Sequence, residues 1–161
     1  MLSLASLGLS QASMAAATDA SAEHLVDTLE AILADATSVT EAAQQGENLG
    51  FEHISEPSDQ FVEMQVPDSD IYLVAEGSGH SDASLLTIVV TKYNAPADCA
   101  ATVRSLVSKK LETDVWVSEQ IDGWSTYEVS FGNRPIANTR FEVGFYTDQK
   151  ACLAQATLVV P

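Results

Sequence analysis

The chain contains 161 residues, of which 46% are hydrophobic, so it can bury a core of its own and fits a single domain. Its 23 acidic and 7 basic residues give a formal net charge of −16, which argues against nucleic acid and anionic membranes as partners. Two cysteines in the whole chain suit one disulfide in an oxidising compartment.

Residues 1–17 combine a short apolar run with small residues at its end, a pattern typical of a secretory signal peptide. We expect cleavage after Ala17, with cleavage after Ala22 as the alternative, because Ala20 and Ala22 also satisfy the small-x-small rule. No basic residue precedes the apolar run, and an N-terminal helix is the competing interpretation. The pattern predicts a periplasmic or secreted protein with no membrane insertion after signal cleavage.

The remaining residues, 18–161, are expected to form one domain with halves at about 18–92 and 93–161. The first half opens with a helix that Ser21 caps and Gly46 ends. Its apolar positions recur at spacings of three and four: Leu25, Leu29, Ile32, Leu33, Ala36 and Val39. Four strand-like runs follow, at about 50–55, 61–66, 71–76 and 84–92. Turn-forming stretches separate them, among them Gly77-Ser78-Gly79.

The second half repeats this order. A helix is expected from Asn94, with Pro96 in its first turn. It carries Cys99, Val103, Leu106 and Val107 on one face. Four more strands are expected at about 114–120, 124–131, 138–147 and 151–160.

The fold class is therefore α+β: two helix-plus-four-strand halves that form antiparallel sheet, with both helices on one face. The halves form either one sheet or two four-stranded sheets related by a pseudo-twofold. Short matches such as Leu86-Thr87-Ile88-Val89-Val90 with Ala156-Thr157-Leu158-Val159-Val160 are compatible with an internal duplication or with chance resemblance between strands.

Cys99 lies on the apolar stripe of the second helix, and Cys152 lies on the apolar face of the last strand. Both side chains should therefore enter the same layer, and we predict a Cys99–Cys152 disulfide.

The histidines offer weak catalytic candidates. His80 lies in Gly77-Ser78-Gly79-His80-Ser81-Asp82, where neighbouring groups in a hairpin loop lack the rigid frame of a catalytic triad. His53 alternates with Phe51 in a strand, but no His-x-His or His-x3-His pair accompanies it. The sequence accordingly assigns no catalytic residue, metal or cofactor.

Strand alternation predicts a binding surface instead. In two successive strands, three residues each point inward: Tyr127, Val129 and Phe131 in the first, and Phe141, Val143 and Phe145 in the second. The opposite face would expose large aromatic rings beside charged groups: Trp116, Trp124, Tyr146, Glu128, Arg140 and Glu142. Exposed aromatic residues are enriched where partners bind, although the protein's own residues could equally cover these rings.

Together these features favour an exported, acidic, non-enzymatic binding or interaction module of the cell envelope. Its partner would be an unidentified protein, peptide or small ligand. Two alternatives are a hydrolase that uses His80 or His53 and a structural envelope protein.

Overall fold

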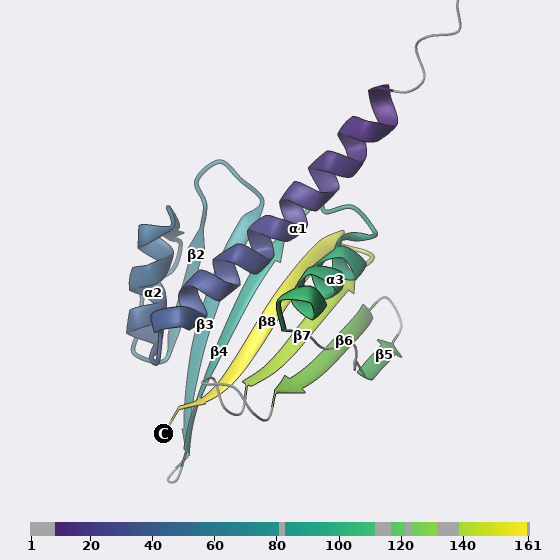
Figure 1. Cartoon of the computed structure of the whole chain (residues 1–161). Helices are drawn as coiled ribbons and strands as arrows, with labels where there is room; N and C mark the ends of the chain where they lie inside the picture. The colour runs from purple at the N-terminus through teal and green to yellow at the C-terminus, as the bar shows by residue number, and fades with distance from the viewer. Residues whose placement is uncertain (1–8, 81–82, 112–116, 122–123, 132–138, 161) are drawn as a thin grey trace, which may run out of the picture.

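The computed structural model describes residues 9–80, 83–111, 117–121, 124–131 and 139–160, with side chains over 22–79, 84–110 and 140–160. These residues form an α+β fold, as predicted, in which helices pack against one antiparallel sheet (Figure 1). The helices are α1 (Leu9–Asp35), α2 (Val39–Asn48) and α3 (Cys99–Leu111). The strands are β1 (Glu52–His53), β2 (Phe61–Gln65), β3 (Ile71–His80), β4 (Ala83–Lys92), β5 (Val117–Ile121), β6 (Trp124–Phe131), β7 (Thr139–Tyr146) and β8 (Ala151–Val160).

The described strands form a single eight-stranded sheet in the order β1-β2-β3-β4-β8-β7-β6-β5. Each half is a meander, and the halves join where β4 pairs with β8 from Ser84↔Val160 to Lys92↔Cys152. Of the two arrangements left open by the sequence, the structure has the continuous sheet.

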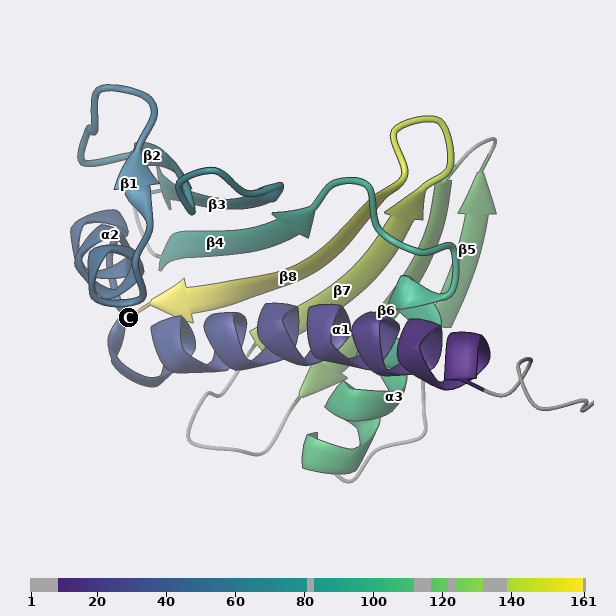
Figure 2. The same ribbon diagram turned by 90° about the horizontal axis from the view of Figure 1, so that it is seen from above.

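The hydrophobic core lies between the helices and one face of the sheet, which we call the inner face. Alternate residues of β2, β3, β4, β7 and β8 supply it: Val62, Met64, Leu73, Ala75, Leu86, Ile88, Val90, Val143, Cys152, Ala154, Ala156 and Leu158. α1 crosses over β4 and β8, α2 contacts β2 and β3, and α3 contacts β7 and β8. Figure 2 shows α1 and α3 on the same side of the sheet.

The expected single helix from Ser21 to Gly46 is in fact two helices, and this prediction was wrong. α1 ends at Asp35, and α2 starts anew with Ser38 as its N-cap. Ser38 has an extended backbone, and its hydroxyl accepts a hydrogen bond of 3.2 Å from the Glu41 N–H. The break lets α2 turn onto β2 and β3 while Ala36 and Val39 both stay buried.

Gly46 is not the helix stop that the sequence suggested. α2 continues through Gly46 to Asn48, and the left-handed residue after it is Gly50, with φ of 89°. The Phe51 N–H donates to the Gly46 carbonyl and the Gly50 N–H to the Glu47 carbonyl, both at 3.0 Å, which is a Schellman motif. Gly46 instead lets the helix approach the sheet closely, because an added Cβ would lie 2.7 Å from Leu73 Cδ2.

The Gly77-Ser78-Gly79 stretch is strand rather than turn, which corrects a second expectation. β3 extends to His80, and its last residues pair with β4 from Gly77↔Leu86 to His80↔Ala83. The low β-propensity of glycine is outweighed here by ladder pairing with a strongly apolar partner strand.

α3 begins at Cys99, five residues later than expected. Asn94 has φ of 51°, a left-handed conformation that cannot start a helix, and the Ala95 N–H bonds the Lys150 carbonyl at 2.8 Å. The later start of α3 does not affect the predicted Cys99–Cys152 disulfide. The sulfur atoms of Cys99 and Cys152 lie at disulfide distance, with Cα atoms 6.1 Å apart and both side chains fully buried.

The N-terminal end of α1 extends beyond the sheet (Figure 1). Its helical backbone begins at Leu9, and residues 1–8 lie outside the described part. Among the described side chains of α1, burial starts at Ala22 and continues with Leu25, Val26 and Leu29.

Candidate functional site

The outer face of the sheet, opposite the helices, is the first candidate surface. Six large hydrophobic side chains are exposed among those described, and four of them lie on this face: Phe61, Leu85, Tyr146 and Val159. Leu85 and Val159 lie directly opposite each other in β4 and β8. Phe61 in β2 pairs with Glu76, which pairs with Thr87 of β4, two residues along the strand from Leu85. Phe61, Leu85 and Val159, with half-buried Val74 and Val89, form what we call the outer patch.

The residues predicted from sequence lie mainly toward the β6 and β7 side of the outer face. Tyr146 is 40% exposed and pairs with Trp124, and Glu142 pairs with Glu128. The side chains of Trp124 and Glu128 lie outside the described residues, as does all of Trp116. Arg140 is exposed, and its guanidinium lies 4.0 Å from the Glu142 carboxylate.

The sheet is not equally open along its length. Ala151 and Leu153 belong to the outer face by register, yet both are buried close to Tyr146. At the outer patch, by contrast, the two residues that face each other across β4 and β8, Leu85 and Val159, are both exposed, at 36% and 37%. Sequence alternation pointed to the same face but emphasised its aromatic end, because Leu, Val and Phe on a strand are usually core residues.

The outer face is acidic. Its described charged side chains are Glu52, Glu63, Glu76, Glu142 and Arg140, four carboxylates against one guanidinium. Thr87 and Thr157 lie between them and share a hydroxyl hydrogen bond of 3.2 Å. The face can therefore offer apolar contact, hydroxyl groups and net negative charge.

A second concavity, of about 300 Å³, lies between α2 and the segment after β1, and His53 lines it. His53 Nε2 lies 2.8 Å from Glu47 Oε1. The Ser58 hydroxyl in the same concavity accepts from the Phe61 N–H at 3.0 Å and donates to the Phe61 carbonyl. These bonds hold Ser58 in a turn and direct its proton away from His53, so the pair lacks a poised nucleophile.

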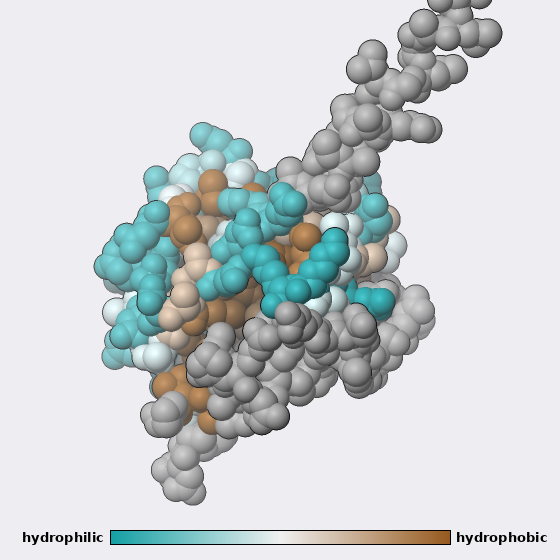
Figure 3. Space-filling view, viewed as in Figure 1, coloured by the Kyte–Doolittle hydropathy of each residue, from teal (hydrophilic) through white to brown (hydrophobic). Residues whose placement is uncertain are grey.

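A third concavity, of about 260 Å³, lies between α1, α3 and β7. Its walls are apolar: Val26, Leu29, Leu33, Ala34, Val107 and Phe141. Figure 3, seen from the helix side, shows hydrophobic surface in this hollow with hydrophilic side chains beside it. We call it the helix pocket.

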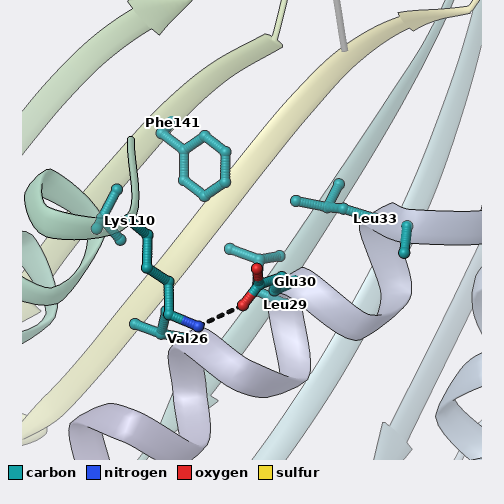
Figure 4. A pocket seen from close by; sticks show the side chains of 8 residues that line it. Val26, Leu29, Glu30, Leu33, Lys110 and Phe141 are labelled. Atoms are coloured by element: carbon teal, nitrogen blue, oxygen red, sulfur yellow. Dashed lines mark hydrogen bonds and ion pairs between the residues drawn. The ribbon is translucent and has the colours of Figure 1, made fainter. Parts of the chain in front are cut away.

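Lys110 and two carboxylates form the polar edge of the helix pocket. Lys110 Nζ donates to Asp27 Oδ1 at 3.1 Å. It also donates to Glu30 Oε2, as Figure 4 shows. The hydrogen bonds that Lys110 donates to Glu30 and Asp27 raise the pKa of Lys110, so the ammonium stays charged. No local sequence pattern indicates this cluster, because its acids and its base are 80 or more residues apart.

Comparison with known proteins finds no matching family model, curated protein or solved structure. Within the described ranges, no three histidine, cysteine or acidic side chains converge as metal ligands would. None of the described helices combines the length and hydropathy needed to cross a bilayer.

Proposed function

We propose that this chain is an exported, non-enzymatic binding module that holds a protein or peptide partner against the outer face of its sheet. The observation that carries the proposal is the gathering of exposed apolar side chains on that face. Isolated exposed hydrophobic residues are normal on protein surfaces, whereas apolar patches rimmed by polar groups mark interaction sites.

The size of the face fits this role. β2, β3, β4, β8 and β7 have five to ten residues each. At about 3.4 Å per residue and about 4.8 Å between strands, they present on the order of 700 Å². A standard protein interface buries about 800 Å² on each partner, so the outer face is nearly large enough by itself.

The charge of the face selects among partners. A second copy of this chain would bring two acidic faces together, and each molecule carries a formal net charge of −16. We therefore expect a partner segment that combines apolar residues with lysine or arginine. The apolar residues would cover the outer patch, and the basic groups would pair with Glu63, Glu76 and Glu142.

A hydrolase remains the less supported alternative. His53 with Glu47 resembles an acid–base pair, but the Ser58 proton is directed to the Phe61 carbonyl. The His80 side chain lies outside the described residues. No observation favours the hydrolase over the binding module.

Export is supported by the cysteine pair at disulfide distance, since disulfides persist in oxidising compartments. Cleavage after Ala17 would keep every described buried residue, whereas cleavage after Ala22 would remove Ala22, which is fully buried. We expect the secreted protein to begin at Thr18. N-terminal sequencing of protein expressed with residues 1–17 tests this, and a retained Met1 in the periplasmic or secreted fraction would contradict it.

The binding proposal is tested by selection from a displayed library of random dodecapeptides. We expect the enriched peptides to combine apolar and basic residues and to lose binding to a Leu85→Lys, Val159→Lys double variant. Both positions are partly exposed, but the two lysines would lie directly opposite each other, so we expect some loss of stability. Circular dichroism checks that the variant is folded before its binding is compared.

The matched control is Leu49→Lys with Ala101→Lys. Both side chains are exposed, Leu49 at the end of α2 and Ala101 in α3, so the control adds the same charge on the helix side of the sheet. Peptides that bind the outer-patch variant and the control equally well would refute the proposal, as would a library that yields no binder.

A further inference from the structure

The helix pocket is a second site, on the opposite side of the sheet from the outer patch, and its walls are built from three separate elements. α1 supplies Val26, Leu29 and Leu33, which are nearly fully buried, while α3 supplies Val107 and β7 supplies Phe141. Figure 4 shows the Phe141 ring and the α1 side chains around one hollow. The hollow therefore lies on the core rather than on a mobile surface loop.

The volume of the pocket suits a small ligand. An apolar cavity of about 150 Å³ in another protein holds benzene, so by proportion about 260 Å³ accommodates on the order of ten heavy atoms. Apolar walls favour an alkyl or aryl group in this space, because burial removes its surface from water.

The edge of the pocket determines the kind of headgroup. Asp27 and Glu30 are exposed carboxylates that share one ammonium, that of Lys110, which leaves the edge with net negative charge. Lys110 is itself 41% exposed and can turn toward solvent when another cation takes its place. An anionic headgroup would meet two carboxylates and a molecule of net charge −16.

We propose that the helix pocket binds small amphipathic amines, with the apolar group between α1, α3 and Phe141 and the ammonium on Asp27 and Glu30. This site is independent of the outer face. Its ligand can bind whether or not a protein partner does.

The test compares n-hexylamine, n-hexanol and n-hexanoate by titration calorimetry and by chemical shifts of the Val26 and Val107 methyl groups at pH 7. We expect hexylamine to bind at least threefold more tightly than hexanol, and hexanoate to bind most weakly, because an exposed ion pair contributes up to about fivefold. Each further methylene should add about fourfold until the pocket is full. The preference for amine over alcohol should shrink in 0.5 M NaCl.

Variants separate the contribution of the carboxylates to ligand binding from that of the apolar walls. Asp27→Asn with Glu30→Gln should abolish the preference for amine while hexanol binding stays unchanged. Glu23→Gln is the matched control, since Glu23 is exposed on the same helix but lines a different surface, beside Lys109. Ala34→Phe, which places a ring where Ala34 lines the pocket, should weaken amine and alcohol alike by tenfold or more.

Three results would overturn the proposal: equal affinity for hexylamine and hexanol, tighter binding of hexanoate, or no methyl shifts with any of the three. Methyl shifts that persist unchanged in Ala34→Phe would place binding elsewhere and would overturn it too. None of these results bears on the outer face.

Discussion

Gly46 shows how one residue fixes the contact between α2 and the sheet. A Cβ at this position would lie 2.7 Å from Leu73 Cδ2 and 2.9 Å from Met64 Sδ, and both of those side chains are fully buried. Glycine is therefore required for close approach, not for helix termination. The termination depends on Gly50, whose φ of 89° favours a residue without a Cβ.

We expect Gly46→Ala to lower the free energy of unfolding by about 1 kcal/mol, because overpacking costs about 1–3 kcal/mol and alanine returns up to about 1 kcal/mol of helix propensity. Denaturant unfolding measures the change. Gly79→Ala is the control, since an added Cβ there meets nothing within 4 Å. An unchanged or raised stability for Gly46→Ala would show that α2 does not pack as described.

Glu41 links the break between α1 and α2 to pH. Its carboxylate accepts hydrogen bonds of 2.8 Å from the Thr37 N–H and from the Thr37 hydroxyl, and these bonds lower the pKa of Glu41 below its usual 4.5. A lowered folded-state pKa means that the stabilisation is present above the unfolded pKa. It is lost as pH falls through the folded value.

Glu41→Gln should therefore destabilise the chain at pH 7, and the difference from the parent should shrink as the pH falls below 4.5 and through the lowered folded-state pKa of Glu41. Urea unfolding of both proteins between pH 3 and pH 7 measures it. A difference that stays constant over this range would mean that ionisation of Glu41 contributes nothing.

At the level of elements, the Cys99–Cys152 pair connects α3 to β8 across 53 residues of sequence. In the chain-entropy model, closing a loop of this length contributes about 4 kcal/mol. We expect Cys99→Ala with Cys152→Ala to lower the free energy of unfolding by up to about this amount, and reduction of the parent protein to act similarly. Unfolding curves that are identical with and without reductant would contradict a formed disulfide.

The strands could be predicted because β-structure leaves a strong local signal. In β7, Phe141, Val143 and Phe145 alternate with Arg140, Glu142 and Tyr146, and the structure pairs this strand as the alternation requires. The helix boundaries were harder. Asparagine and glycine are common at helix ends, but Asn94 bonds Asp70 and Gly46 packs closely against Leu73, and only the folded chain brings these residues together.

The two candidate sites also differ in how far they could be predicted from the sequence. Alternation revealed the outer face, because side-chain direction in a strand follows from position alone. The exposure of Leu85 and Val159 could not be predicted, since apolar strand residues are usually covered. The helix pocket depends on Lys110 reaching Asp27 and Glu30 from a different helix, which no local pattern encodes.

For the whole molecule, the sheet separates two surfaces with different chemistry. Helices and core occupy the inner face, and the helix pocket lies among them. The outer face carries the outer patch and four described carboxylates. A broad, acidic, partly apolar sheet suits a protein or peptide partner, whereas the narrow pocket suits a small molecule.

The most direct test of the binding proposal is amide chemical-shift mapping of the labelled protein with an enriched basic, apolar peptide. We predict shifts centred on Leu85, Val89 and Val159 in β4 and β8, and their loss in the Leu85→Lys, Val159→Lys variant. Shifts centred instead on α1 and α3, or on the surroundings of His53, with the outer patch unaffected, would contradict the account.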